Sequence, residues 1–281
     1  MNQLPAHLRT QMFRCLAEGN SVRATSRLCG VAFNTVLKII PDLGAACAAY
    51  QDEAFRNLNC RRLQLDEIWS FCKTKQRNVK PEDKDKGWGD VWTWIALDAD
   101  TRLIPAWHVG KREFSDAATF VNGLASRLAH RVQLTTDGHN AYLSAIENAF
   151  GDEIDYAMLV KLYGPAKNDA QSRYSPPACI GTRKTLVTGK PDAAHVSTSY
   201  IESQNLTLRM HNRRFTRLTN AYSRKLENHK HSIALSFMHH NFCKIHSSLR
   251  VTPAMEAGIT DHVWEPEEVI ALTNRKIERA A

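Results

Sequence analysis

The order of extended and helical segments in the middle of the chain constrains its fold more than any other feature. The stretch LQLDEIWSFC at 63–72 alternates and is rich in large apolar residues, which is typical of a strand. VWTWIALDA at 91–99 and RLIPAWHVG at 102–110 show the same character and are joined by a short turn, so they indicate a hairpin. The central part of the chain therefore begins with three strands in a row.

Helices and strands then alternate along the chain. Residues 115–130 indicate a helix, 132–137 a short strand, 139–150 a second helix and 156–163 another strand. Three strands followed by helix, strand, helix and strand is the order of an RNase H-like sheet. The expected fold class is therefore α/β, with a mixed sheet flanked by helices.

The first forty residues have the spacing of short helices. Ser21 can cap a helix through its hydroxyl, and a tight turn at 29–31 leads into the apolar-periodic segment 32–40, which Pro41 ends. This pattern predicts a helix-turn-helix over residues 1–41, with 32–40 as the recognition helix.

The recognition helix would present Asn34, Thr35 and Lys38 to a DNA groove, while Val36 and Ile39 pack inward. A small helical bundle without DNA contact is the alternative, because three short helices are a common arrangement.

The remaining sequence suggests three further parts. Residues 42–60 are rich in alanine and predict a helical connector. Residues 61–265 would form the RNase H-like domain, interrupted at 164–199 by a loop rich in Gly, Pro, Ser and Lys. Residues 266–281 would form a C-terminal tail.

Charge and cysteine usage restrict the class of protein. Lys and Arg number 37 against 29 Asp and Glu, and this formal net charge of +8 favours acidic partners such as nucleic acid. No apolar run approaches the roughly 18 residues that a membrane helix needs, and the polar start lacks a secretion signal, so a cytoplasmic protein is expected. The seven widely spaced cysteines argue against a disulfide framework and a zinc ribbon.

Three carboxylates stand at positions from which a metal site can be built. Asp66 lies in the middle of a predicted strand, Asp137 at a strand end and Glu202 at the start of a helix. Hard divalent cations take oxygen ligands, and two neighbouring ions need a bridging carboxylate. Taken alone, each acid has a plainer explanation, such as a turn or a helix cap. Glu67 stands beside Asp66, and alternation does not decide which of the two points into the site.

Three segments resemble a known family of enzymes. LDEIWSF at 65–71, TTDGHNAYL at 135–143 and the long stretch from YIESQNLTLRMHNRRF to TPAM at 200–255 are similar to transposases of the IS1 type, within the wider DDE superfamily. The resemblance covers roughly residues 60–265.

This resemblance implies a catalytic role for the predicted carboxylates. It places the acidic triad on Asp66, Asp137 and Glu202, favours Asp66 over Glu67, and implies an RNase H-like fold that uses Mg²⁺, with Mn²⁺ as a possible substitute. The implied activity is metal-dependent cleavage at transposon ends, followed by strand transfer into target DNA.

The expected partners are double-stranded DNA, as transposon ends and target, and further copies of the chain, because two ends must be processed together. The localisation expected for such a protein is cytoplasmic, of bacterial type and nucleoid-associated. The N-terminus departs from the family, because it has no paired cysteines for the zinc finger that IS1-type proteins commonly carry. A DNA-binding regulator with an inert RNase H-like body and a structure-specific nuclease remain as alternatives.

The helix that begins near Glu202 continues as a basic segment. Arg209 lies seven residues after Glu202, and at about 100° per residue the two side chains share one helix face two turns apart. Aromatic residues interleave the segment, so one side can pack while the other follows a DNA backbone, although such runs are often solvated faces. The residues expected to contact DNA phosphates are Arg209, Arg213, Arg214 and Arg217.

Overall fold

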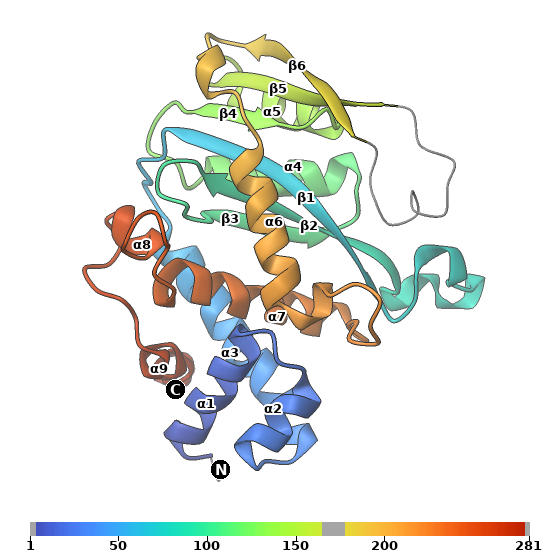
Figure 1. The fold of residues 1–281 in the computed structure, drawn as a ribbon, viewed down its shortest axis with the longest axis vertical. Coiled ribbons are helices and arrows are strands. Elements are labelled where there is room, and N and C mark those ends of the chain that lie inside the picture. The colour runs from blue at the N-terminus through green and yellow to red at the C-terminus, as the bar shows by residue number, and fades with distance from the viewer. Residues whose placement is uncertain (1–3, 165–177, 279–281) are drawn as a thin grey trace.

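The structure is a computed structural model that describes residues 4–164 and 178–278 (Figure 1). At its centre is one six-stranded sheet in the order β3-β2-β1-β4-β5-β6. β1 is antiparallel to β2 and parallel to β4, β4 is parallel to β5, and β5 is antiparallel to β6. The strands are β1 (Arg62–Cys72), β2 (Gly89–Asp98), β3 (Ala106–Gly110), β4 (Gln133–Thr136), β5 (Asp155–Tyr163) and β6 (Cys179–Thr188).

Helices cover both faces of this sheet (Figure 1). Leu65 and Trp94 belong to the hydrophobic core that the sheet shares with α4 and α5. Ile68 and Ile95 belong to the opposite core, which the sheet shares with α6 and α7. The mixed α/β sheet flanked by helices that the sequence predicts is therefore confirmed. These helices are α4 (Phe114–Ala125), α5 (Ala141–Phe150), α6 (Ser199–His211) and α7 (Leu226–Met238).

Three helices precede the sheet: α1 (Ala6–Ala17), α2 (Val22–Cys29) and α3 (Phe33–Ala54). Ser21 caps α2 as predicted, because its hydroxyl accepts the backbone N–H of Ala24 at 3.1 Å. Gly30 ends α2 with a φ of 63°, a conformation that glycine adopts without steric cost. Val36 is fully buried, whereas Asn34 and Lys38 are exposed and Thr35 is partly exposed.

The sequence predicts that this helix ends at Pro41, but α3 continues to Ala54. A proline inside a helix removes one backbone hydrogen bond and crowds the preceding turn. Ile40, Leu43 and Cys47 are buried in the hydrophobic core that includes Leu65 and Trp94, here called the main core, and this burial offsets that cost. Residues 42–54, predicted as a connector, are therefore part of a core helix, and a cut after residue 41 would divide it.

The predicted loop at 164–199 contains an element that the sequence did not reveal. Residues 165–177 lie outside the described residues, but 179–188 form the edge strand β6. Side chains on both sides of β6 are mostly exposed, so the strand lacks the apolar alternation that marks a half-buried strand.

The C-terminal part adds α8 (Pro253–Glu256) and α9 (Pro266–Glu278). Val269, Ile270 and Leu272 of α9 are buried in the main core, and α9 packs against α1 and α3. The predicted tail is thus attached to the body, while the predicted domain boundaries as such stay a prediction.

Within the described part of the chain, no single helix is long and apolar enough to cross a bilayer. Only α2 and α3 taken together have the length and apolar composition of a membrane span, and the chain bends by 111° between them.

A buried histidine joins α7 to the sheet. His229 is fully buried, and its two ring nitrogens lie 2.9 Å from the hydroxyls of Ser70 and Ser223. Burial lowers the pKa of His229 to about 3, so between about pH 6.5 and pH 3 the unfolded chain binds a proton there that the folded chain does not.

We therefore expect this histidine to lower the free energy of unfolding by up to about 1.4 kcal/mol per pH unit as the pH falls below 6.5. Denaturant unfolding at several pH values would show a shallower loss for His229→Gln than for the parent. His7→Gln, at an exposed site, is the control. Parallel pH profiles of the parent and His229→Gln would contradict this prediction.

Candidate active site

The candidate site lies where two parallel strands separate. β1 pairs with β4 only from Arg62 to Gln64, and Asp66 lies two residues further along β1. β4 ends at Thr136, so Asp137 is the first residue beyond its carboxyl end. Crevices at the carboxyl ends of strands are the usual ligand sites of open α/β sheets.

A pocket of about 590 Å³ opens at this point, and all three predicted acids, Asp66, Asp137 and Glu202, line it. They come from a strand, a strand end and the first turn of α6, as the sequence predicts. Other residues that line the pocket include Arg112, His139, Asn140, Lys161, Tyr163 and Thr198.

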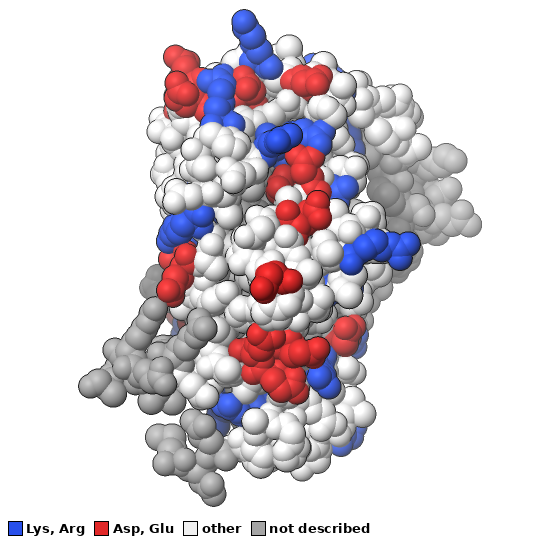
Figure 2. All heavy atoms as spheres, turned by 90° about the vertical axis from the view of Figure 1, so that its left-hand side faces the viewer, with Lys and Arg blue, Asp and Glu red and all other residues white. Residues whose placement is uncertain are grey.

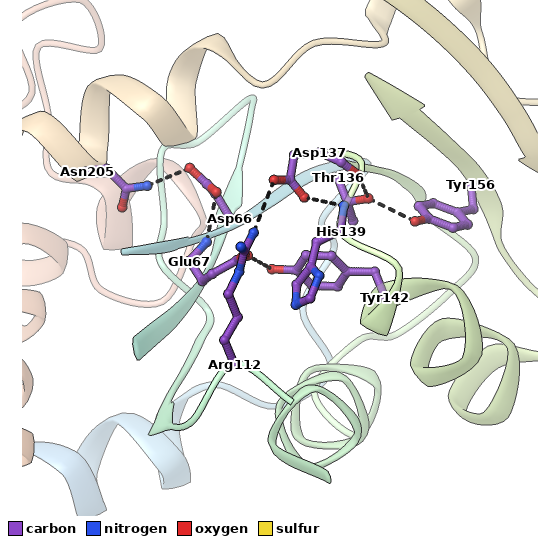
Figure 3. A network of polar contacts seen from close by, with 9 residues as sticks. All are labelled: Asp66, Glu67, Arg112, Thr136, Asp137, His139, Tyr142, Tyr156 and Asn205. Carbon is purple, nitrogen blue, oxygen red and sulfur yellow. Dashed lines mark hydrogen bonds and ion pairs between the residues drawn. The ribbon is translucent and has the colours of Figure 1, made fainter. Parts of the chain in front are cut away.

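A tighter group of carboxylates lies within and beside the pocket (Figure 3). Asp66, Glu67 and Asp137 each offer an oxygen, and these oxygens all lie within 4.8 Å of one another. Carboxylate oxygens are the ligands that hard divalent cations prefer, so this cluster could hold a divalent metal ion.

Asp66 is held in place by two donors. Its carboxylate accepts the side-chain amide of Asn205 at 2.7 Å and the backbone N–H of Glu67 at 2.9 Å. Burial raises the pKa of Asp66 to about 7, with repulsion from Glu67 and Asp137 as further causes. The charged cluster is therefore costly without a cation.

Glu67 has a different environment from Asp66 although the two are adjacent. Its side chain is 1% exposed, and it accepts Arg112 Nε at 2.6 Å and the Tyr142 hydroxyl at 3.1 Å. Burial raises the pKa of Glu67, and Arg112 and Tyr142 oppose that rise. In the described part of the chain, Asp66 lines the pocket and Glu67 does not. Glu67 is thus already compensated by protein groups.

Asp137 is more open than either neighbour. Its side chain is 39% exposed, and one oxygen accepts the backbone N–H of His139 at 2.9 Å, which fixes the turn that follows β4. The other oxygen lies 3.9 Å from Arg112 Nη2. Arg112 therefore lies between the carboxylates of Glu67 and Asp137 (Figure 3).

Glu202 belongs to α6, which packs on the sheet face that carries Ile68 and Ile95. The Gln64 side-chain oxygen accepts the backbone N–H groups of Tyr200 and Ile201, each at 3.0 Å, and so fixes the start of α6 against β1. The Glu202 carboxylate then accepts the Thr198 hydroxyl at 2.6 Å and the Lys161 ammonium. Glu202 also raises the pKa of Asp66, although it is the smallest of the causes.

The surroundings of Asp66 suit a hard cation. Asn205 is buried, its amide nitrogen binds Asp66, and its Oδ1 atom is buried without a hydrogen-bond partner among the described residues. A buried acceptor without a donor is costly. The carboxylate oxygens of Asp66, Glu67 and Asp137 are hard donors, so the cluster fits a hard divalent cation.

The predicted phosphate-binding arginines lie in different environments. Arg209 follows Glu202 on α6, burial lowers its pKa, and Asp66 is close enough to oppose that shift. Arg217 is exposed and Arg213 partly exposed. Arg214 instead donates to the Ser223 hydroxyl at 3.0 Å, and burial lowers its pKa. DNA contact by Arg209, Arg213, Arg214 and Arg217 stays a prediction, as it does for Asn34, Thr35 and Lys38.

Several side chains of this site were not found from the sequence. Arg112, Lys161, Tyr142 and Asn205 contact the acids from positions without a motif of their own. The only signal was indirect, since Tyr142 and Asn205 lie a few residues after Asp137 and Glu202 in the quoted segments.

One face of the molecule carries charges of both signs. Figure 2 shows the side of the molecule that lies at the left in Figure 1, where Asp and Glu gather into several patches with Lys and Arg beside them. This face is therefore not a continuous basic surface.

Comparisons with known proteins assign no family to the chain. No family model matches the sequence, and no curated protein matches it. Among solved structures, the chain is similar to the piggyBac transposase in its synaptic complex with hairpin DNA, with 9% identity and a TM-score of 0.36 over 97% of this chain and 72% of that one. Likeness of this degree assigns neither family nor activity, and the resemblance to IS1-type transposases stays a prediction.

Proposed function

We propose that the chain is a DDE-type DNA transposase, of the IS1 type that its motifs resemble. The observation that carries this proposal is the convergence of Asp66, Asp137 and Glu202 on one pocket, from the middle of β1, the carboxyl end of β4 and the first turn of α6. In this proposal the three acids are the catalytic triad and the ligands of Mg²⁺, with Mn²⁺ as a substitute.

The protein groups of the pocket have separate roles. Asp66, Asp137 and Glu202 would hold the cations, which when bound lower the pKa of a water and offset charge on the leaving oxygen. Asn205 orients Asp66, and the backbone N–H of His139 orients Asp137. Glu67 balances the charge of Arg112 and keeps its guanidinium beside the pocket.

The reaction would proceed as two attacks at phosphorus in the same pocket. Water first attacks the phosphate at a transposon end, the bond to the 3′ oxygen breaks, and that oxygen leaves as a hydroxyl. This 3′-hydroxyl then attacks a phosphate of the target, forms the new ester and releases a target 3′-hydroxyl. Neither step needs a covalent bond to the protein.

DNA would contact two parts of the chain. The chain turns by 111° between α2 and α3, within the range for a helix-turn-helix, and Asn34 and Lys38 are exposed on α3. In this proposal, residues 1–41 read the transposon ends, while Arg209 and Arg217 contact phosphates near the pocket. Two copies on DNA would process two ends together.

A plasmid assay separates this function from its alternatives. The substrate carries the DNA that flanks the gene, and the reaction contains Mg²⁺ or EDTA. A transposase is expected to nick it only with the metal and to join the cut end to a second duplex. Binding without nicking would instead indicate a regulator, and nicking without joining would indicate a nuclease.

A further inference from the structure

A row of aromatic rings extends from the rim of the pocket along the β1–β2 ribbon. Trp69 of β1 lies directly opposite Trp92 of β2. The ring centroids of Trp69 and Phe71 are 5.7 Å apart, and those of Phe71 and Tyr222 are 5.1 Å apart. We call these four residues, Trp92, Trp69, Phe71 and Tyr222, the aromatic strip.

The strip is on the sheet face of Glu67 and Trp94, but it is not part of the core there. Trp94 is fully buried against Phe120 of α4 and Tyr142 of α5. Trp69 and Trp92 are partly exposed. Figure 1 shows β1 and β2 continuing past the helices toward the loop with η1 (Gln76–Asn78) and η2 (Pro81–Lys86).

Cations lie over the rings of this region. The Arg112 guanidinium is 4.9 Å from the ring centroid of Trp92, and the Lys75 ammonium is 5.9 Å from that of Trp69. Nearby, Trp88 has the ammonium groups of Lys73 at 5.4 Å and Lys86 at 5.0 Å. Arg112 also lines the pocket, so the strip begins at the candidate active site.

This combination favours one kind of ligand. Partly exposed rings give flat surfaces on which unpaired bases stack, and adjacent cations attract the phosphates that join those bases. Paired bases of a duplex are stacked on one another and cannot lie on such rings. The charge and the ring faces therefore suit a single strand.

We propose that the aromatic strip binds the unpaired bases of a DNA strand beside the cleaved phosphate, with Lys75 and Arg112 on its backbone. This rests on the proposed function only in taking DNA as the polymer in the pocket. It adds a single-stranded ligand to the double-stranded partners, and it assigns a role to rings that the catalytic site does not use.

The strip can be tested without any cleavage by measuring how the chain binds a labelled single strand of about twelve thymidines. Fluorescence anisotropy in the presence of EDTA measures this binding. We expect the parent chain to bind it, Trp69→Leu to bind about tenfold more weakly, and Trp69→Phe to stay within about threefold, because phenylalanine keeps a ring for stacking.

A strand of the same length with abasic sites is the matched ligand. The parent and Trp69→Leu are expected to bind it equally, because no base remains to stack. An equal loss on both strands would mean that Trp69 acts only on the fold, and that result would overturn the proposal. So would a parent chain that does not bind the thymidine strand.

Two lysines of one loop provide a second test if Trp69→Leu fails to fold. Lys75→Ala should weaken binding of the thymidine strand several-fold more than Lys80→Ala, because the Lys80 ammonium lies 3.8 Å from Glu82 rather than over a ring. Equal effects would refute the strip. Strip-dependent binding by a chain that does not cleave DNA would refute only the proposed function.

Discussion

Asp66→Asn, Asp137→Asn and Glu202→Gln are each expected to reduce metal-dependent DNA cleavage by about a thousandfold or more, which is about 4 kcal/mol of transition-state stabilisation. Each change keeps the shape of the side chain and removes the charge that would bind the cation. All three residues line one pocket, so the effect should be common to them. Single-turnover cleavage of the flanking-DNA substrate measures it.

Folding and DNA binding should survive these three substitutions. Each variant is expected to retain the melting temperature and duplex affinity of the parent, because its shape is unchanged and the repulsion around Asp66 is relieved. Asp42→Asn, at an exposed position of α3, controls for the loss of one carboxylate. Substantial Mg²⁺-dependent cleavage by any of the three variants would remove that residue from the triad.

Gly44→Ala is expected to destabilise the fold by about 3 kcal/mol or more, because it would force two core helices apart. A Cβ atom on Gly44 would lie 2.5 Å from the Cβ and 2.7 Å from the backbone oxygen of His231 in α7. Backbone atoms cannot yield as a flexible side chain can. The melting temperature should therefore fall by roughly 6–12 °C.

Gly123 provides the matched control in another helix. A Cβ atom there would meet nothing within 4 Å, so Gly123→Ala should stabilise α4 by about 0.5–1 kcal/mol. Equal melting temperatures for Gly44→Ala and the parent would show that α3 and α7 are not in backbone contact.

The sheet was predictable because burial leaves a pattern in its strands. The alternation around Asp66 marks β1, which has one core on each face, and Asp137 could be placed because its strand is short and ends in a turn. β6 could not be found in this way, because water reaches most side chains on both of its faces. The end of α3 was misplaced because Pro41 is a local signal, whereas the packing of Leu43 is not.

The polar partners of the site depend on the folded structure in the same way. Arg112 reaches Glu67 across 45 residues, and Lys161 reaches Glu202 across 41. No local pattern records such a contact, because it arises only when the loop after β3 and the strand β5 are in place. For the same reason, alternation alone could not separate Asp66 from Glu67, whose different surroundings come from α6 and α5.

The proposed active site depends above all on Glu202, rather than Glu67, completing the metal site with Asp66 and Asp137. Glu67 lies closer to those two carboxylates, but its side chain is 1% exposed, whereas the Glu202 side chain is 39% exposed and lines the pocket. Calorimetric titration of Mn²⁺ into the DNA-bound chain distinguishes the two acids. We predict that Glu67→Gln retains the parent's affinity within a few-fold and that Glu202→Gln loses at least about tenfold, or about 1.4 kcal/mol. Loss of affinity in Glu67→Gln with parental affinity in Glu202→Gln would contradict the proposed site.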